Sequence, residues 1–557
     1  MTPLKRFYNL LKLDKKDIYQ IVFYAAFSGL ISMSLPLGIQ AIVNFIQGGQ
    51  ISVSWIVLII IVTLGVALVG ILTLMQLRIT ENLQQKIFIR SSFEFAHRLP
   101  KLTFNSLYDK YPPEVANRFF DTLTIQKGTS KLLLDFTTAI LQVGLGLVLL
   151  SLYHSFFIIF GVLLLILLYI IFKFSFQDGL NTSLKESTFK YKVAYWLQEI
   201  ARNKSSFSRR NNFEYALDKN DKLVNNYISF REKHFNVIKR QFSQLIAYKV
   251  FITAGLLSVG GFLVLNQQMN IGQFVAAEII ILLIINSVEK LILGFETLYD
   301  VLTAVEKIGV VTDLEIEKST KNTNIDCVET DYTLETEDMT YRYPDNDKDI
   351  IKKVNIKINQ GEKVFITGAN NSGKTTLVRL LSGFLSPSSG VLYINDNIVK
   401  RSEGECYKSH IGVVMQEDTP FEGTLLENIT FNNPNINGED VKWALNAVGL
   451  TTATKRLPMG LDTPVNADGR QLTRSIIQKI MIARAIVKRP KILFLEEPTI
   501  SMDPQSAKKI IDFLVSPENK WTIVVSSVDE YWKKACKRQI EMENGQVIND
   551  ININGNA

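Results

Sequence analysis

The chain has 557 residues, a hydrophobic fraction of 47% and a formal net charge of +7 at pH 7. Its mean hydropathy of +0.13 is high for an entirely soluble protein, and its length allows several domains. The Lys and Arg residues lie mainly beside apolar stretches, which suits membrane-flanking segments better than a nucleic-acid-binding surface. The three cysteines, Cys327, Cys406 and Cys536, lack metal-ligand spacing and predict free thiols in a reducing compartment.

Most of residues 18–295 is rich in Leu, Ile, Val and Phe, whereas residues 311–557 have an ordinary soluble composition. A membrane-spanning helix needs about 20 apolar residues, because the hydrocarbon core is about 30 Å thick. Buried helices of a large soluble protein are the alternative, but stretches such as Phe156–Phe172 contain no charge at all. Six spans are therefore predicted: Ile18–Phe45, Val53–Met75, Leu132–Tyr153, Phe156–Phe172, Leu245–Leu265 and Ile271–Phe295.

The charges of the connections predict the orientation of these spans. The connections after the second and fourth spans, about residues 76–131 and 173–244, are long and contain many Lys and Arg, whereas the other three contain none. Both termini and the long connections should therefore be cytoplasmic, with the membrane helices continuing far into the cytosol. Glu278 is about two turns into the last span and either lines a central cavity or lies near the outer interface.

The most informative motif is the stretch from Gly368 to Thr376, which reads Gly-Ala-Asn-Asn-Ser-Gly-Lys-Thr-Thr. Such a glycine-rich loop turns successive backbone N–H groups toward one phosphate, and the following helix presents its positive end to the same anion. An apolar strand before the loop and a helix after it fit this interpretation. The candidate ATP-binding residues of the loop are Gly368, Asn370, Asn371, Ser372, Gly373, Lys374, Thr375 and Thr376. Lys374 should reach the β- and γ-phosphates, and Thr375 should hold Mg²⁺.

Further stretches accompany this loop: Thr340–Pro344, Ile411–Gln416, Pro420–Ile429, Thr463–Gly469 and Ile492–Asp503. Together they resemble the nucleotide-binding domain of an ABC transporter, and six spans before such a domain resemble an exporter half-transporter. The membrane half is loosely similar to type I protein-secretion and bacteriocin exporters. Residues 1–16 leave no room for the N-terminal peptidase domain that many of those exporters have.

The resemblance implies a role for individual residues. Tyr343 would stack on adenine, and Gln416 would contact Mg²⁺ and sense the membrane domain. Glu496 would hold Mg²⁺ through water, although the family has Asp there, and Glu497 would polarise the attacking water. Asp503 belongs to a loop that crosses the dimer interface. The implied Mg²⁺ site therefore consists of Thr375, Gln416 and Glu496.

Two departures from the family pattern stand out. The signature Leu-Ser-Gly-Gly-Gln is replaced by Leu472-Thr473-Arg474-Ser475-Ile476, so both glycines that let the backbone approach the opposite subunit's phosphate are missing. Arg474 could clash with closure or pair with that phosphate, and Thr473 keeps a hydroxyl. Val528 stands where the family has a switch histidine that contacts the γ-phosphate. These changes predict slow or asymmetric hydrolysis.

The predicted fold is a multi-pass α-helical membrane domain of six helices followed by an α/β P-loop NTPase domain. The expected boundaries are residues 1–310 for the membrane domain, 311–332 for a linker, 333–550 for the ABC nucleotide-binding domain and 551–557 for a polar tail. Candidate contact helices between the two domains are Pro112–Phe120 and Ala194–Ala201. The expected location is a bacterial inner (plasma) membrane, with the ATP domain in the cytoplasm.

The resemblance implies ATP-driven export, of a peptide or protein, by one half of a dimer, with ATP and Mg²⁺ as cofactors. Both a homodimer and a heterodimer are open, and the degraded signature beside a retained Glu497 slightly favours a heterodimer. Lipid or drug export also remains open, and a periplasmic adaptor is an expectation from the resemblance alone. The alternative is a regulatory subunit that binds ATP, hydrolyses little and gates a partner. A soluble P-loop enzyme with an anchor fails to explain six spans. No nucleic-acid partner is expected.

Overall fold

The computed structural model describes residues 1–47, 53–317, 332–395, 397–398 and 404–553, and these form two compact units. The first unit consists of Met1–Lys101 and Lys110–Leu314, and the second of Leu102–Asp109 and Glu315–Ala557. Most of the expected linker and the end of the expected polar tail lie outside the described residues, as do Cys327 and the first connection between spans.

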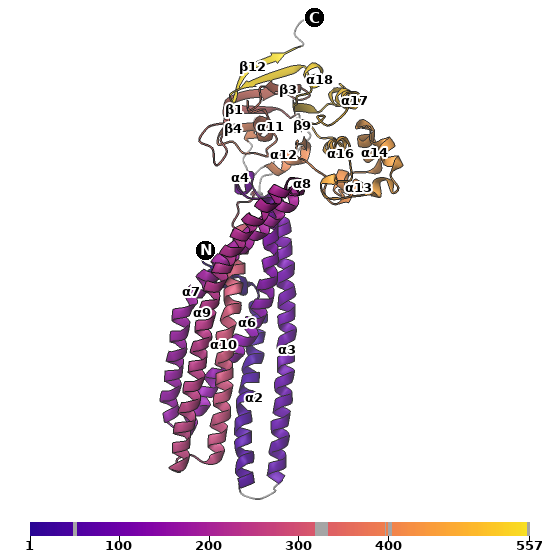
Figure 1. Cartoon of the computed structure of the whole chain (residues 1–557). Helices are drawn as coiled ribbons and strands as arrows, with labels where there is room; N and C mark the ends of the chain where they lie inside the picture. The colour runs from indigo at the N-terminus through magenta and orange to yellow at the C-terminus, as the bar shows by residue number, and fades with distance from the viewer. Residues whose placement is uncertain (48–52, 318–331, 396, 399–403, 554–557) are drawn as a thin grey trace. The chain divides into compact units, whose positions relative to one another are not determined.

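The regular elements of the described residues of the first unit are all helices (Figure 1). Its helices are α1 (Pro3–Leu13), α2 (Lys15–Gln47), α3 (Val53–Arg98), α5 (Pro112–Asn117), α6 (Asp121–Tyr153), α7 (Phe156–Arg202), α8 (Lys204–Phe207), α9 (Arg210–Leu265) and α10 (Ile271–Thr312), with the 3₁₀ turns η1 (Leu99–Lys101) and η2 (Arg118–Phe120). Six of these helical segments are long and apolar enough to cross a membrane, which confirms the six predicted spans. Helix α9 has 56 residues, so its length of about 84 Å far exceeds the hydrocarbon core.

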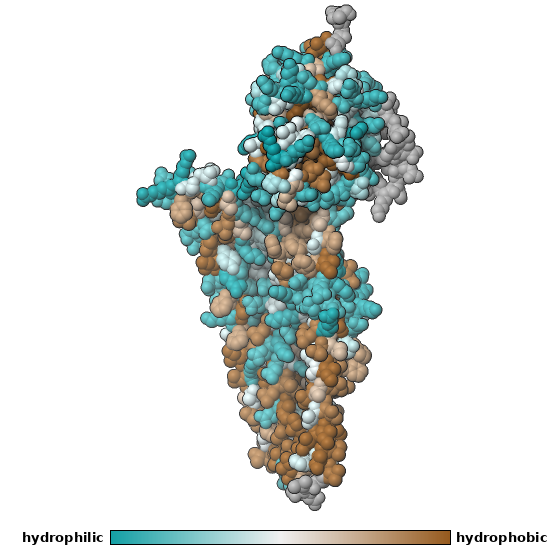
Figure 2. Space-filling model, turned by 90° about the vertical axis from the view of Figure 1, so that its right-hand side faces the viewer, coloured by the Kyte–Doolittle hydropathy of each residue, from teal (hydrophilic) through white to brown (hydrophobic). Residues whose placement is uncertain are grey.

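The surface of this unit fits a lipid environment over part of its length. Figure 2 shows hydrophobic side chains gathered over the end of the helices that carries the short connections, with hydrophilic side chains more common toward the other end. In α3 the most apolar stretch has none of its residues buried within the chain, and Ile60, Leu64 and Ile71 are each more than half exposed. Such a surface is expected for a helix that meets lipid or a second subunit.

Helices α6 and α10 approach each other closely at small residues. A Cβ atom on Gly128 of α6 would overlap the Val301 side chain of α10, and one on Gly294 of α10 would overlap the ring of Phe136. Another glycine of α6, Gly144, has no atom within 4 Å of the position that a Cβ would take. Glycines at contacts of this kind let two membrane helices pack backbone to side chain.

The described residues of the second unit form three β-sheets and short helices. Its largest sheet has the order β12-β11-β3-β10-β9-β6 and is parallel except for β12, and a four-stranded antiparallel sheet has the order β2-β1-β4-β5. The strands are β1 (Leu334–Tyr341), β2 (Ile351–Ile358), β3 (Lys363–Gly368), β4 (Ser389–Ile394), β5 (Asn397–Ile398), β6 (Ile411–Val414), β7 (Gly423–Thr424), β8 (Pro464–Val465), β9 (Ile492–Glu496), β10 (Thr522–Ser526), β11 (Arg538–Glu543) and β12 (Gln546–Asn552). The helices are α11 (Lys374–Leu381), α12 (Gly404–His410), α13 (Leu425–Thr430), α14 (Gly438–Ala447), α15 (Thr451–Arg456), α16 (Arg474–Ile486), α17 (Pro504–Val515) and α18 (Glu530–Ala535). The predicted strand and helix around the P-loop are β3 and α11.

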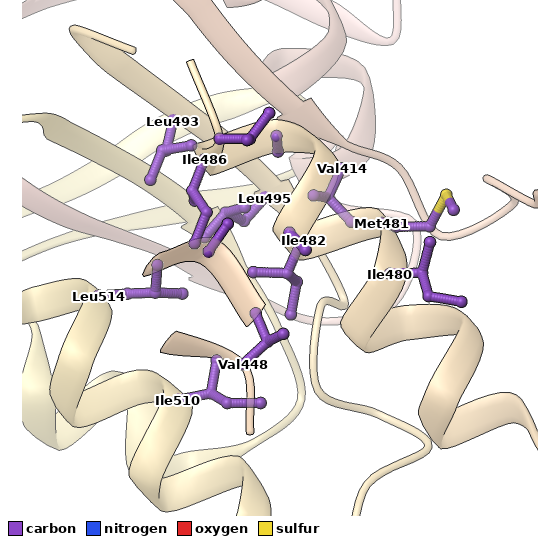
Figure 3. Packing of buried hydrophobic residues seen from close by; sticks show 14 of the residues in the cluster. Val414, Val448, Ile480, Met481, Ile482, Ile486, Leu493, Leu495, Ile510 and Leu514 are labelled. Carbon is purple, nitrogen blue, oxygen red and sulfur yellow. The ribbon is translucent and has the colours of Figure 1, made fainter. Parts of the chain in front are cut away.

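Buried side chains cover the parallel strands on both faces. Strands β9 and β10 are buried at every position, as expected for parallel strands in the middle of a sheet. Figure 3 shows one cluster, in which Ile482 and Ile486 of α16 pack with Leu493 and Leu495 of β9. These contacts hold α16, which begins within the degraded signature, against the strand that ends in Glu496.

A short segment between the second and third spans folds with the second unit. Helix α4 (Phe104–Leu107) lies in this segment, and Leu102 forms an isolated antiparallel bridge with Ile316. The ring of Phe104 packs 5.7 Å from that of Phe384. This segment carries no motif from which its place could be predicted. The two stretches predicted as contact helices, Pro112–Phe120 and Ala194–Ala201, belong to the first unit.

We expect the substitution Gly128→Ala to lower the thermal midpoint of the membrane unit, because the added methyl group overlaps Val301 and overpacking costs about 1–3 kcal/mol. Gly144→Ala on the same helix is the matched control and should be neutral or slightly stabilising, since Ala favours helix and meets no neighbour there. Thermal unfolding of the detergent-purified chain measures both. Equal midpoints for the two variants would contradict the packing of α6 on α10.

Candidate functional site

The candidate site lies where three neighbouring parallel strands end. Strands β3, β10 and β9 pair in parallel, so the loops after their carboxyl ends meet at one edge of the sheet. These loops carry the P-loop, Ser527 with Val528, and Glu497. They enclose a cavity of about 930 Å³, large enough for a nucleotide. The cavity is lined by Tyr343, Ile350, Phe365, Thr367, Gly368, Asn370, Asn371, Ser372, Gly373, Lys374, Thr375, Thr376, Gln416, Glu497, Ser526, Ser527, Val528, Glu530 and Lys533.

The backbone of the P-loop is shaped to receive an anion. Gly368, Asn371 and Gly373 have φ values of 144°, 65° and 102°, which turn the peptide groups away from ordinary strand or helix geometry. A Cβ on Gly368 would overlap the carbonyl oxygen of Met542, so only glycine fits there. The Ser372 hydroxyl is buried and has no hydrogen-bond partner among the described residues. An unsatisfied hydroxyl inside an anion-binding loop fits a phosphate oxygen as its partner.

Lys374 lies inside this loop. Its ammonium group donates to the carbonyl oxygens of Gly368 at 2.8 Å and Ala369 at 2.7 Å. Burial lowers the pKa of Lys374, and the negative charge of Glu497 acts in the opposite direction. The ammonium group therefore folds back onto its own loop and is positioned to exchange these carbonyls for phosphate oxygens.

Tyr343 sits at the rim of the cavity among other aromatic rings. Its hydroxyl is 3.3 Å from the Thr376 hydroxyl, and its ring stacks on that of Tyr108 with centroids 5.5 Å apart and planes inclined by 28°. The ring of Tyr341 meets it edge-on at 5.0 Å. These neighbours fix the plane of the Tyr343 ring beside the P-loop helix, where a purine could stack.

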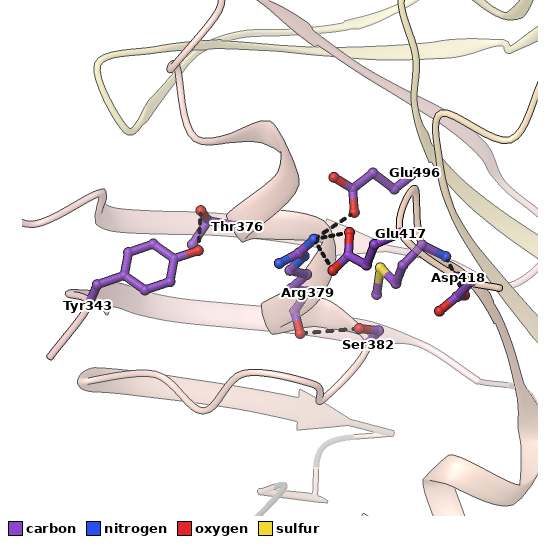
Figure 4. A network of polar contacts seen from close by, with 8 residues as sticks. Tyr343, Thr376, Arg379, Ser382, Glu417, Asp418 and Glu496 are labelled. Atoms are coloured by element: carbon purple, nitrogen blue, oxygen red, sulfur yellow. Dashed lines mark hydrogen bonds and ion pairs between the residues drawn. The ribbon is translucent and has the colours of Figure 1, made fainter. Parts of the chain in front are cut away.

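Glu496 is only 3% exposed and belongs to an ionic network (Figure 4). Arg379 of α11 lies 3.3 Å from Glu496 and contacts both carboxylate oxygens of Glu417, at 2.7 and 2.8 Å. The side chain of Asp418 accepts the N–H of Met415 at 2.8 Å, which fixes the turn around Gln416. A buried carboxylate needs such a cation, because an unpaired charge in the interior is strongly unfavourable.

The three expected Mg²⁺ ligands are only partly brought together. Thr375 and Gln416 both line the cavity, whereas the carboxylate of Glu496 is bonded to Arg379 and does not line it. Thr375, Gln416 and Glu497 all line the cavity and carry a hydroxyl, an amide and a carboxylate oxygen. They suit a hard cation such as Mg²⁺.

Glu497 follows β9 and also faces the cavity. Its φ of 46° is unusual for a residue with a side chain. One carboxylate oxygen accepts the Ser527 hydroxyl at 3.0 Å and the Val528 N–H at 3.1 Å. The Val528 side chain is 69% exposed and lines the cavity, so the position of the expected histidine lies at the site but carries no polar group.

The signature residues and Asp503 are not among the residues that line this cavity. Thr473 is the N-cap of α16 and accepts the Ile476 N–H at 3.4 Å, and Arg474 starts that helix with an exposed side chain. Leu472 packs against the core cluster, and Ser475 is partly exposed. Asp503 caps α17 by accepting the Ser506 N–H at 2.9 Å. Glu278 is partly exposed on α10 in the other unit.

Sequence reasoning missed three residues at this site. Arg379 could have been found, because it lies one helical turn after Thr375 and Thr376, on the helix that follows the P-loop. Ser527 directly precedes Val528, yet its hydrogen bond to Glu497 joins two strands that are distant in sequence. Tyr108 carries no local signal, since it lies between two membrane spans.

Comparisons with known proteins agree with this geometry. Residues 351–500 match the family model described as ABC transporter. The chain is 28% identical over 332 residues to the alpha-hemolysin translocation ATP-binding protein HlyB of Escherichia coli O157:H7, covering 59% of this chain and 46% of that protein. It is 28% identical over 330 residues, with the same coverage, to the leukotoxin translocation ATP-binding protein LktB of Mannheimia haemolytica. The chain thus matches about half the length of these curated relatives.

A solved structure extends the likeness to the whole chain. The structure of a bacterial Atm1-family ABC exporter with ATP bound matches with a TM-score of 0.85 at 18% sequence identity, over 97% of this chain and 95% of that one. Six helices that are long and apolar enough to cross a membrane, together with these likenesses, indicate an integral membrane protein. The chain therefore carries an ABC transporter domain behind six candidate membrane spans and has the fold of an ABC exporter.

Proposed function

We propose that this chain is one half of a dimeric transporter that couples hydrolysis of ATP to export of a protein or peptide. The observation that carries the proposal is the shared cavity at the end of β3, β10 and β9. It places the phosphate-binding lysine Lys374, the amide of Gln416 and the carboxylate of Glu497 around one space. Phosphoryl transfer requires a fixed phosphate, a positioned water and compensation of negative charge, and these groups supply all three.

Each group has a role in this mechanism. The P-loop N–H groups and Lys374 hold the phosphates, and the Ser372 hydroxyl gains the partner that it lacks. Tyr343 stacks on the adenine ring. Thr375 and Gln416 would hold Mg²⁺, which would supply positive charge against the phosphates, whereas Glu496 is bonded to Arg379 and would act on it only through water. Glu497 accepts a hydrogen bond from the attacking water and orients it.

The proposed cargo follows from the relatives. HlyB and LktB are described as translocating alpha-hemolysin and leukotoxin, which are proteins. Because the membrane unit has the exporter fold, the same class of cargo is the simplest proposal for this chain. A periplasmic adaptor would then continue the path beyond the inner membrane.

The proposal of a second subunit rests on the signature residues, which are not among the residues that line the cavity. Thr473 and Arg474 do not line the cavity of their own chain, and in the proposed dimer they face the ATP of the opposite subunit. Arg474 is exposed at the first turn of α16 and would bring a positive charge to that phosphate. A partner with an intact signature would complete the site that contains Glu497, so we favour a heterodimer.

A second candidate function is a regulatory subunit that binds ATP and gates a partner with little hydrolysis of its own. The observation that favours it is Val528, whose apolar side chain lines the cavity where the family has a histidine. Loss of a polar contact to the γ-phosphate weakens transition-state stabilisation and leaves ground-state ATP binding intact.

We expect Glu497→Gln to abolish ATPase activity in lipid, both of the chain alone and at its site when it is paired with a subunit that carries an intact signature, while ATP binding is retained, because the amide cannot serve as the base. The loss should be at least about a hundredfold. Lys374→Ala is the matched control for the binding role and should weaken ATP binding itself. Secretion of a co-expressed cargo protein should fall in parallel with ATPase activity. Unchanged secretion in the Glu497→Gln variant would instead support the regulatory function.

We expect Val528→His to raise the rate of hydrolysis by about tenfold with little change in the KM for ATP, since a charge-assisted hydrogen bond contributes about 1.5–3 kcal/mol. Val528→Ala, which changes size without adding a polar group, is the control. Steady-state ATPase assays of the three proteins at equal lipid content measure this. A histidine variant no faster than wild type would show that the missing side chain does not limit turnover.

A further inference from the structure

The backbone of Glu497 is held on both sides. Its N–H donates to the carbonyl oxygen of Ser526 at 2.9 Å, and its own carbonyl oxygen accepts the Gln478 side chain at 3.2 Å. The same Gln478 side chain accepts the N–H of Ser501 at 2.9 Å, so α16 is tied to the loop after β9. These bonds stabilise the uncommon φ of 46° at Glu497.

The carboxylate of Glu497 is held separately. Its Oε2 atom accepts the hydroxyl of Ser527 at 3.0 Å and the N–H of Val528 at 3.1 Å. No hydrogen bond to Oε1 is found among the described residues, and the Glu497 side chain lines the cavity. One oxygen is thus anchored, and the other is available to a water in the cavity.

The direction of the Ser527 hydroxyl is set by its neighbours. Ser527 is 7% exposed, and its oxygen accepts the N–H of Asp529 at 3.1 Å. The Ser527 proton is therefore free to point at Glu497. Asp529 is itself fixed, because its carboxylate accepts the Thr499 hydroxyl at 3.2 Å and the Tyr531 N–H at 2.9 Å.

We propose that Ser527 is a positioning residue for Glu497, which takes over part of the orienting role left open by Val528. The proposal deepens the proposed function and rests on it, because it concerns the same hydrolysis step. A glutamate side chain has three rotatable bonds, and fixing one oxygen before ATP binds reduces the number of unproductive orientations. With the Val528 N–H as its only donor, the Glu497 carboxylate could still rotate about that one hydrogen bond. The Ser527 hydroxyl is a second donor, and together the two donors define the plane of the carboxylate.

This role differs from a purely structural one. The Ser527 hydroxyl does not bind the Glu497 backbone, which keeps its bonds to Ser526 and Gln478 when the hydroxyl is removed. Ser527 also holds no residue of the P-loop in the described part of the chain. Its removal should therefore affect turnover and not ATP binding.

The test compares Ser527→Ala with Ser527→Thr in the full-length chain in lipid. Ser527→Ala should lower kcat by about tenfold with the KM for ATP unchanged, because a hydrogen bond to a charged group is lost. Ser527→Thr keeps the hydroxyl and should restore most of the activity. Ser516→Ala is the matched control, since the Ser516 hydroxyl accepts a backbone N–H at 3.4 Å in the same unit but away from the cavity. It should behave as wild type.

Three results would overturn the proposal. Ser527→Ala with the kcat of wild type would show that the hydroxyl does not position Glu497, and a higher kcat would show that it restrains Glu497. A rise in KM together with a lower thermal midpoint, unrelieved in Ser527→Thr, would show a structural role. Failure of the proposed function itself is distinguishable, because the wild-type chain would then show no hydrolysis that depends on Glu497, even when it is paired with a subunit that carries an intact signature, and Glu497→Gln would match it.

Discussion

The parallel pairing of β3, β10 and β9 is the constraint on which the candidate site depends. Parallel strands end at the same edge of the sheet, so three loops that are far apart in sequence lie together there as a result of the strand pairing alone. The P-loop, Ser527 and Glu497 each follow one of these strands. A shift of register in any one strand would move its loop out of the cavity, and the burial of β9 and β10 at every position disfavours such a shift. The buried strands of the hydrophobic core thus position the polar residues of the site.

Ionic and hydrogen-bonded links then connect the loops to each other. Arg379 joins the helix after the P-loop to Glu496 and to Glu417, the neighbour of Gln416. Because Glu496 is almost fully buried, removing the arginine would leave an unpaired charge in the interior, which typically costs about 3–5 kcal/mol. The buried pair does not by itself imply added stability. It makes the position of Glu496 and the position of the Gln416 loop depend on one guanidinium group.

The sequence was sufficient for much of this architecture and for part of the site. Six apolar stretches and a Gly-x-x-x-x-Gly-Lys-Thr loop between a strand and a helix predict the six spans and the P-loop domain, because both depend on local patterns. The pairing of Ser527 with Glu497 could not be predicted, since it depends on which strands become neighbours. Glu496 was expected to hold Mg²⁺ through water, but its carboxylate contacts Arg379. The spacing of residues in the sequence does not indicate that Arg379 would pair with this carboxylate. The assignment of Leu102–Asp109 to the second unit could not be predicted either, because this segment follows a membrane helix and has no motif of its own.

The membership of Leu102–Asp109 in the second unit has a consequence for how the ATP domain is connected. The polypeptide passes between the units at Lys101–Leu102, at Asp109–Lys110 and at Leu314–Glu315, so the two are joined by three covalent strands of chain. A single cleavage of the polypeptide therefore cannot separate the ATP domain from the helical unit. A fragment that begins after the last membrane helix would lose the ring of Phe104 from Phe384 and the ring of Tyr108 from Tyr343. The surface beside the nucleotide cavity would then be exposed in a form that the intact protein never presents to solvent.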